Sequence, residues 1–309
     1  MTRLRVGTRA SVLARTQSQS IADLLTTALD VTVELVPVVS EGDRSSAPLT
    51  EIGGQGVFVG AVRDALVAGD VDVVVHSLKD LPTLADERVR LAAVPSRDDS
   101  RDALVARDGL TLGELPVGST VGTGSPRRAA QVNALGLGVD VVPVRGNVDT
   151  RLAKVASGEL DAVLLARAGL VRLGRQHEIT ETIDPIQMLP APGQGALAVE
   201  VVAAAEGLAS EIADALDDSF TRAAVTAERA LLRTLEAGCL APVGALAEVA
   251  EGEDGLELWL RAVVVALDGS RAVRLSAVGC ITEPAEVGDR LAKEMLAEGA
   301  DSIMQEQTP

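Results

Sequence analysis

The chain has 309 residues, of which 47% are hydrophobic and 24% are charged, so it can form the core of a globular protein of two or three domains. Its net charge of −17 and aromatic content of 1% argue against a nucleic-acid partner, because such a chain repels phosphates and has few rings on which bases stack. No apolar run approaches the roughly 18 residues of a membrane span, and the apolar stretch near the N-terminus is too short for a signal-peptide core, so we expect a cytoplasmic protein with no membrane partner.

Two stretches of the chain repeat each other in sequence. The matching blocks are strands at 6–8 and 121–123, helices over 13–29 and 126–135, strands at 33–38 and 139–144, and strands at 69–75 and 158–164. Because the blocks recur in the same order, they indicate an internal duplication. Their Val-rich strands lack polar alternation, which predicts parallel strands buried on both faces.

Beyond residue 217 the pattern changes. We expect a helix over 220–237 that ends at Gly238, strands over 243–248, 256–266 and 273–280, and a last helix over 284–300. The predicted fold class is α/β, with two similar open-sheet domains of periplasmic-binding-protein type joined by a hinge, plus a third small α+β domain. The predicted domains are residues 1–97 with a return segment 191–216, residues 98–190, and residues 217–309.

Polar side chains follow the predicted strands of both copies. In open parallel sheets, ligands bind beyond the carboxyl ends of the strands. This rule selects Thr8, Arg9, Ser11, Ser40, Gly42, Asp43, His76, Ser77, Lys79 and Asp80 in the first copy, and Thr123, Ser125, Arg127, Arg128, Arg145, Asn147 and Arg167 in the second.

The second copy carries an anion-binding pattern. Ser125 before Pro126 predicts a helix N-terminus whose free N–H groups, with Arg127 and Arg128 beside them, favour a carboxylate or phosphate. The alternative is an ordinary cap with two solvated arginines. Arg145 and Arg151 bracket a further turn, where they either bind an anion or form surface ion pairs with Asp149 or Asp140.

The turn at residues 76–82 places ionisable groups side by side. Asp80 can stabilise a developing cation or relay a proton, while Lys79 binds an anion. The alternative is a structural turn with a half-buried His76. Of the two cysteines, Cys239 follows a helix end, where an inert, partly buried thiol is usual, and Cys280 is expected in the core of a strand. No cysteine or histidine spacing suggests a metal site.

Taken together, these motifs resemble the porphobilinogen deaminase family. The resemblance runs from Arg3 to about Gly244 and is weaker beyond. The matching motifs are Thr8-Arg9-Ala10-Ser11, residues 75–82, residues 122–128, residues 145–151, residues 191–195, and Glu228-Arg229 leading to Gly238-Cys239-Leu240-Ala241-Pro242.

The resemblance implies a monomeric transferase of porphyrin and heme biosynthesis that joins four porphobilinogen molecules into hydroxymethylbilane and releases ammonia. It implies a dipyrromethane cofactor attached by a thioether to Cys239, and Asp80 as the catalytic residue. The implied cofactor-binding residues are Asp43, Lys79, Asp80, Ser125, Arg127, Arg128 and Arg151, and the implied substrate-binding residues are Arg9, Ser11, Arg145, Arg151, Arg172 and Gln194.

Two other functions fit parts of the pattern. The duplicated architecture also suits a non-enzymatic module that binds small anions, as solute-binding proteins do. A Schiff-base enzyme could use Lys79, with pyridoxal phosphate at the helix that begins near Ser125. The sequence also departs from the family, which often has lysine at the position of Gln55 and serine at the position of Gly124.

Overall fold

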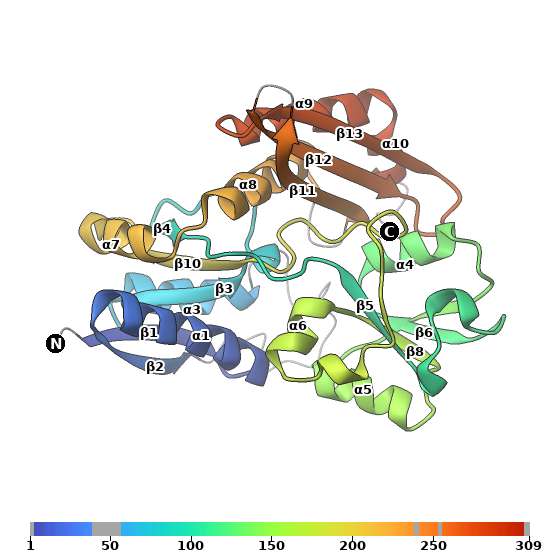
Figure 1. Cartoon of the computed structure of the whole chain (residues 1–309), viewed down its shortest axis with the longest axis horizontal. Helices are drawn as coiled ribbons and strands as arrows, with labels where there is room; N and C mark the ends of the chain where they lie inside the picture. Colours follow the sequence, from blue (N-terminus) through green and yellow to red (C-terminus); the bar gives the residue numbers. More distant parts are fainter. Residues whose placement is uncertain (1–2, 39–56, 238–240, 253–254, 306–309) are drawn as a thin grey trace. The chain divides into compact units, whose positions relative to one another are not determined.

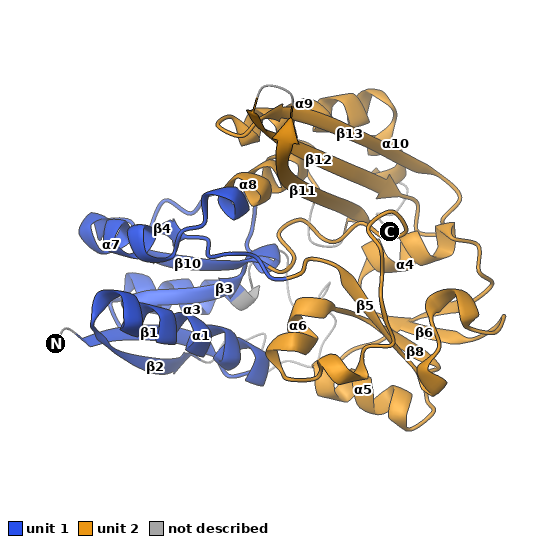
Figure 2. Cartoon of the chain, in the orientation of Figure 1, with its two compact units in different colours: residues 1–98, 196–222 blue, residues 99–195, 223–309 orange. Residues whose placement is uncertain are grey.

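The computed structural model describes residues 3–38, 57–237, 241–252 and 255–305. The chain forms two compact units (Figure 2). Unit 1 comprises residues 1–98 and 196–222, and unit 2 comprises residues 99–195 and 223–309. Within the described parts, none of the helices combines the length and hydropathy that a membrane span requires.

Unit 1 is built around one five-stranded sheet. Its elements are β1 (Arg3–Arg9), α1 (Val12–Leu29), β2 (Thr32–Val38), α3 (Val57–Val67), β3 (Val73–Ser77), the 3-10 helix η1 (Leu78–Asp80), β4 (Val89–Ala93), β10 (Leu197–Val202) and α7 (Glu206–Leu216). The strand order is β2-β1-β3-β10-β4, with β1 parallel to β2 and β3, and β10 antiparallel to β3 and β4.

Both faces of this sheet are buried, as the sequence predicts. Val73 and Val75 pack with residues of α1 and α7, whereas Val74 packs with residues of α3. The alternation follows from the strand period of two, which turns successive side chains to opposite faces. Valine therefore suits positions 73–75 of β3, because neither face of the strand meets water there.

Unit 2 contains a second sheet of the same kind (Figure 1). Its elements are β5 (Asp102–Ala106), η2 (Arg107–Gly109), η3 (Leu112–Glu114), β6 (Thr120–Thr123), α4 (Pro126–Ala134), β7 (Asp140–Pro143), α5 (Val148–Ala156), β8 (Ala162–Ala166), α6 (Arg167–Arg172), η4 (Gln176–Glu178) and β9 (Glu181–Thr182). The strand order β7-β6-β8-β5-β9 repeats that of unit 1 position by position. The α/β class and the duplication are thus confirmed.

A three-stranded antiparallel sheet completes unit 2. It consists of β11 (Val243–Gly252), β12 (Gly255–Val265) and β13 (Ala272–Cys280), with the helices α8 (Ser219–Thr234), α9 (Pro284–Ala297) and α10 (Ala300–Gln305). Leu258 and Leu260 face a core shared with these helices, while Val263 and Val265 face Leu189 on the other side. The boundaries predicted for three domains stay a prediction.

Two predicted helix ends are wrong, both because the backbone turns left-handed. The last predicted helix is divided into α9 and α10, and Gly299 between them has φ +87°. The predicted helix over 220–237 ends instead at Thr234, and Glu236 has φ +51°. A left-handed residue cannot continue a right-handed helix.

Candidate active site

The carboxyl ends of β1 and β3 lie at the same edge of the unit 1 sheet, because these strands are parallel neighbours. Thr8 is buried at the end of β1 and Arg9 follows it half-buried. Ser11 caps α1 by accepting a hydrogen bond from the backbone N–H of Ala14 at 3.3 Å. The structure therefore brings the described strand-end residues of the first copy, those that follow β1 and β3, to one edge.

The turn after β3 is anchored by a buried leucine. Leu78 is fully buried, its N–H donates to the carbonyl of Ala196 at 3.0 Å, and its own carbonyl accepts from the N–H of Leu81 at 3.1 Å. Between these anchors Lys79 is half-buried and Asp80 is exposed. The backbone that carries the Asp80 carboxylate is thus fixed, while the carboxylate itself can meet a ligand.

His76 lies inside β3 rather than in the turn, and it is buried rather than half-buried. Its Nε2 is 3.3 Å from Oε2 of Glu200, and Nε and Nη2 of Arg63 lie 2.8 Å and 2.6 Å from the two Glu200 oxygens. Burial alone raises the pKa of Glu200, but Arg63 and His76 outweigh it and lower that pKa to about 2. Unit 1 therefore contains a buried, ionised carboxylate that the sequence did not single out.

In unit 2, α4 begins as predicted. Pro126 is its first residue, and the Ser125 hydroxyl accepts a hydrogen bond from the N–H of Arg128 at 3.5 Å. The two arginines that follow the cap are 3% and 6% exposed, for Arg127 and Arg128 respectively. The alternative of two solvated arginines is therefore wrong.

Asp102 explains how two adjacent arginines can be buried. It is 0% exposed, and its carboxylate lies 2.7 Å from Nη1 of Arg127 and 2.8 Å from Nη2 of Arg128. Burial favours the neutral acid, but the two guanidinium groups dominate and hold the pKa of Asp102 well below its usual range. Asp102 thus compensates half of the positive charge at the start of α4 and orients both side chains.

Sequence reasoning missed Asp102, although one signal pointed to it. Asp102 begins the apolar run Ala103, Leu104, Val105, which forms β5. A carboxylate at the start of a doubly buried strand needs a cationic partner, because burying an unpaired charge is costly. Arg127 and Arg128 were the candidates, but nothing local in the sequence paired them with a residue 25 positions earlier.

A third arginine lies near this pair without a carboxylate of its own. Nε of Arg151 donates to the carbonyl of Gly146 at 2.9 Å, and among the described residues no acid lies within ion-pair distance of it. Burial and the neighbouring Arg128 lower the pKa of Arg151. Asp149, the predicted alternative partner, pairs with Arg175 at 3.2 Å instead. Arg145 is exposed just beyond β7.

The segment 190–195 is held in place from several sides. Gln194 is 1% exposed, and its Nε2 donates to the Ser100 carbonyl and to Asp102, each at 2.8 Å. The carbonyl of Gly195 accepts from Nη2 of Arg172 at 2.6 Å. Gln194 therefore connects this segment to the Asp102 cluster.

Glu228 extends the same network into α8. Its carboxylate is fully buried and accepts from the N–H of Gly193 at 2.6 Å and of Ala247 at 2.8 Å. This carboxylate ties α8 both to segment 190–195 and to β11. The motif that begins at Glu228 in the sequence thus has a structural role in shaping the neighbourhood of the arginines.

The residues singled out in the sequence that fall outside the described residues include Ser40, Gly42, Asp43, Gln55 and Cys239. The prediction for Cys280 is wrong, because this cysteine lies exposed at the end of β13, with its Sγ 3.0 Å from the Thr282 hydroxyl. Strand β13 has only one of its faces against the core, so a residue at its end is accessible to water.

The charges in unit 2 fit a ligand that carries carboxylates. Arg127, Arg128 and Arg151 supply three positive charges and Asp102 removes one, which leaves two. The buried Nε of Arg127 has no hydrogen-bond partner among the described residues. Guanidinium groups held in fixed orientations bind carboxylates by paired hydrogen bonds, so this cluster is suited to a polycarboxylate.

Comparison with known proteins gives matches along nearly the whole chain. Residues 4–210 match the family model "Porphobilinogen deaminase, dipyromethane cofactor binding domain", and residues 222–297 match "Porphobilinogen deaminase, C-terminal domain". Porphobilinogen deaminase of Mycobacterium tuberculosis (strain H37Rv) is 58% identical over 97% of this chain and 98% of its own length. That of Nocardia farcinica is 57% identical over 99% and 89%.

Likeness to solved structures is much weaker. A periplasmic substrate-binding protein of an ABC transporter from Coxiella burnetii is 12% identical, with a TM-score of 0.43 over 69% of this chain and 91% of that chain. A similarity at this level has no bearing on function.

Proposed function

The chain belongs to the porphobilinogen deaminase family, and from that premise we propose which of its residues perform the reaction. The protein is a deaminating transferase that uses a dipyrromethane cofactor and joins four porphobilinogen molecules into hydroxymethylbilane with release of ammonia. The family match over both parts of the chain is the observation that carries this conclusion. It gives no support to a non-enzymatic anion-binding module.

We assign cofactor binding to the cationic cluster of unit 2. The cofactor supplies the pyrrole ring to which the first substrate is joined, and its rings carry acetate and propionate groups. Arg127, Arg128 and Arg151 would hold these carboxylates, with Ser125 at the helix end beside them. The residual charge of this cluster supports the assignment. Cys239 is the proposed attachment point, and Asp43 and Lys79 are proposed further contacts.

Asp80 is the proposed catalytic residue. Loss of ammonia leaves the substrate electron-poor, and attack on it by a pyrrole carbon places positive charge on pyrrole nitrogens. An ionised carboxylate accepts hydrogen bonds from pyrrole N–H groups and stabilises that charge. The exposure of Asp80 and the anchoring of its turn by Leu78 support this role.

We propose Arg9, Ser11, Arg145, Arg151 and Arg172 as contacts to substrate carboxylates. Gln194 has a different proposed role, since its side chain is buried and hydrogen-bonded to Asp102. It acts as a positioning residue rather than as a contact to substrate. It orients Arg128 through Asp102 and through its own Oε1, which accepts from Nη2 of Arg128 at 3.4 Å.

Intact-mass measurement combined with turnover tests these assignments. We expect the purified protein to exceed its sequence mass by two pyrrole units, and Cys239→Ser to lack this adduct. Cys280→Ser is the matched control, because Cys280 is the other cysteine of the chain and is exposed. Asp80→Asn should keep the adduct and lose at least about a hundredfold in turnover.

Two results would overturn the assignments. An active enzyme with the bare sequence mass would remove Cys239 as the attachment point. Near-normal turnover in Asp80→Asn would remove Asp80 as the catalytic residue. An aldimine absorbance that disappears in Lys79→Ala would instead favour the Schiff-base alternative.

We also propose that the enzyme acts as a cytoplasmic monomer. One chain supplies both five-stranded sheets and Cys239, so the proposed reaction needs no residue from a second copy. Light scattering on the active protein should give a mass near 31.8 kDa, and a dimer that loses activity on dilution would contradict the proposal.

A further inference from the structure

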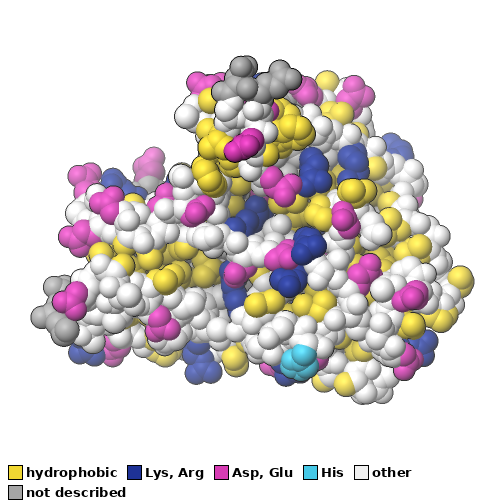
Figure 3. All heavy atoms as spheres, in the orientation of Figure 1, with side chains coloured by type: hydrophobic (Ala, Val, Ile, Leu, Met, Phe, Trp, Pro, Cys, Tyr) yellow, Lys and Arg dark blue, Asp and Glu magenta, His cyan; other side chains and the backbone are white. Residues whose placement is uncertain are grey.

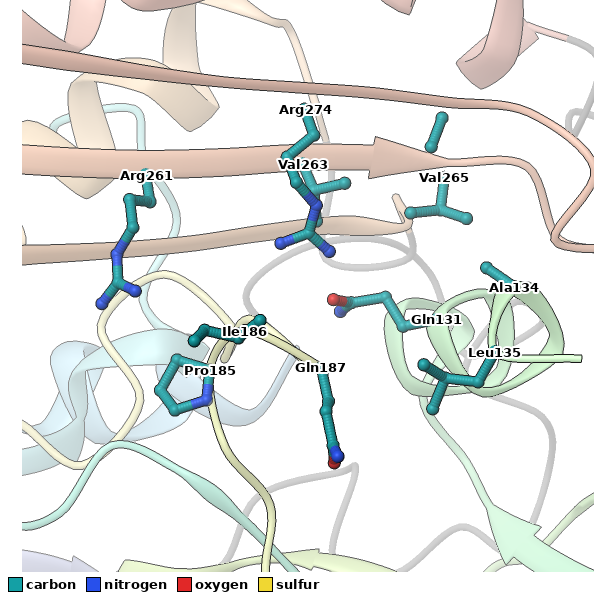
Figure 4. A pocket seen from close by; sticks show the side chains of 11 residues that line it. Gln131, Ala134, Leu135, Pro185, Ile186, Gln187, Arg261, Val263, Val265 and Arg274 are labelled. Atoms are coloured by element: carbon teal, nitrogen blue, oxygen red, sulfur yellow. The ribbon is translucent and has the colours of Figure 1, made fainter. Parts of the chain in front are cut away.

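A cavity of about 400 Å³ lies in unit 2 at the outer face of the three-stranded sheet (Figure 4). Its walls come from β12 and β13, from the C-terminal half of α4, and from the segment 185–187. The lining residues include Gln131, Leu135, Ile186, Arg261, Val263 and Arg274. The volume falls in the range of ordinary small-molecule sites.

The strand register explains why this cavity has one apolar and one cationic part. Val263 and Val265 are buried against Leu189 on this face of β12. Two residues before Val263, Arg261 projects from the same face, and Arg274 is the direct cross-strand partner of Val263. Both guanidinium groups extend from the sheet toward the segment 185–187 and α4, as Figure 4 shows.

The charges at the cavity do not cancel. Arg261 pairs with Glu248 at 2.6 Å, whereas none of the described carboxylates pairs with Arg274. Among the described residues that line the cavity, none is acidic. Burial and the neighbouring Arg261 lower the pKa of Arg274, but an arginine remains charged at neutral pH. One positive charge is therefore left uncompensated.

The opposite walls combine apolar side chains with the amides of Gln131 and Gln187, and they are partly fixed. Gln131 forms two hydrogen bonds with the backbone of Leu189. Its Nε2 donates to the Leu189 carbonyl at 3.0 Å, and its Oε1 accepts from the Leu189 N–H at 2.8 Å. Ile186 lines the cavity from the neighbouring segment and is 76% exposed, so its side chain is accessible to an apolar ligand.

We propose that this cavity, whose lining includes none of the residues assigned to the reaction, is a second binding site for a small organic monocarboxylate. Arg274 and Arg261 would bind the carboxylate, and Leu135, Ile186 and Val263 would contact its apolar body. The single uncompensated charge matches one carboxylate better than the two that each porphobilinogen ring carries. Inorganic phosphate can pair with the guanidinium groups but leaves the apolar side chains of the cavity without a partner.

Calorimetric titration with three probes tests this proposal on the cofactor-bearing protein. Cyclohexanecarboxylate should bind with a dissociation constant of about 1 mM or tighter. Cyclohexanecarboxamide has the same shape without the charge, and inorganic phosphate has charge without the apolar body, so both should bind at least about tenfold more weakly. Fluorescence of Trp259, the chain's single tryptophan, gives a second readout because it lies two residues before Arg261 in β12.

Matched variants locate the binding. Arg274→Gln should weaken cyclohexanecarboxylate binding about tenfold or more and leave turnover unchanged. Arg233→Gln removes the same charge from α8, where Arg233 pairs with Asp289 at 3.1 Å, and should bind like the wild type. Arg145→Gln should also bind normally, which separates this site from the proposed substrate contacts.

Four outcomes would overturn the proposal, and three of them are comparisons between probes or variants. These are equal binding of the carboxylate and the carboxamide, phosphate binding as tight as that of the carboxylate, and equal effects of Arg274→Gln and Arg233→Gln. Absence of saturable binding up to several times the expected dissociation constant would do the same.

Discussion

The two five-stranded sheets have the same strand order, yet the buried carboxylate of each sheet lies at a different position along its strands. In unit 2, Asp102 begins β5 and pairs with Ala166, the last residue of β8. In unit 1, the corresponding partner of Ser77, the last residue of β3, is Leu197, and Glu200 lies three residues further along β10. The same kind of charge cluster thus reaches the strand ends in one unit and lies below them in the other.

The position of the carboxylate decides what its arginine partners can do. Asp102 holds Arg127 and Arg128 at the start of α4. In open sheets, ligands bind beyond the carboxyl ends of the parallel strands, where helix N-termini also lie. Glu200 holds Arg63 of α3 and the strand residue His76, which leaves the strand ends of unit 1 to Lys79 and Asp80. We infer that Asp102 prepares a binding site, whereas Glu200 stabilises unit 1.

The largest expected effect is that of removing the Asp102 carboxylate. Asp102→Ala leaves two buried guanidinium groups facing each other, so we expect a loss of about 3 to 5 kcal/mol in the free energy of unfolding and a reduced cofactor adduct. Asp102→Asn keeps the shape and should keep more of the fold than of the adduct. Chemical denaturation and intact mass measure both.

A surface pair provides the control for that variant. Asp149→Asn removes an aspartate that pairs with Arg175 in the same unit but is half exposed, so its effect on stability should stay within about 1 kcal/mol. If Asp102→Asn formed the full adduct at wild-type stability, Asp102 would not prepare a binding site, and the inferred difference between Asp102 and Glu200 would be wrong.

Glu200 should show the opposite pattern, with a loss of stability but not of the adduct. Its pKa of about 2 in the folded protein lies below the ordinary 4.5, so it contributes stability above pH 4.5 that is lost as the pH falls toward 2. That contribution is about 3 kcal/mol. Glu200→Gln should lower stability at neutral pH by a similar amount and flatten the acid limb of the stability profile.

Denaturation between pH 2 and pH 7 checks this expectation. Glu206→Gln serves as the matched control, because the pair of Glu206 with Arg90 at 3.4 Å is exposed. A wild-type acid limb in Glu200→Gln, or loss of its adduct, would contradict a purely stabilising role.

The sequence predicted the repeated strands because doubly buried parallel strands require valine-rich runs. It also predicted the cap at Ser125, since that signal is local. It could not pair Asp102 with Arg127, because the contact depends on where the chain re-enters a sheet after crossing between units. The helix end at Thr234 was missed for another reason, namely that a glutamate rather than a glycine takes the left-handed conformation there.

The smallest expected effect concerns a position at which the two copies differ. The strand β1 ends in Thr8-Arg9, whereas the matching β6 is followed by Gly124, so unit 2 lacks a side chain where unit 1 has a cation. A Cβ at Gly124 would lie 3.7 Å from Nη2 of Arg151 and only 2.8 Å from the Val144 carbonyl oxygen. The glycine thus leaves room for an arginine that comes from α5 instead.

Gly124→Ala should therefore lower the free energy of unfolding by about 1 kcal/mol, because the Val144 carbonyl must shift. If Arg151 moves with that carbonyl, the KM for porphobilinogen should rise a few-fold with little change in kcat. Gly113→Ala is the matched control, since nothing lies within 4 Å of a Cβ there. If Gly124→Ala lowered stability as expected but left KM unchanged, glycine would be needed at position 124 only for packing. The position of Arg151 would then not depend on the space beside Gly124.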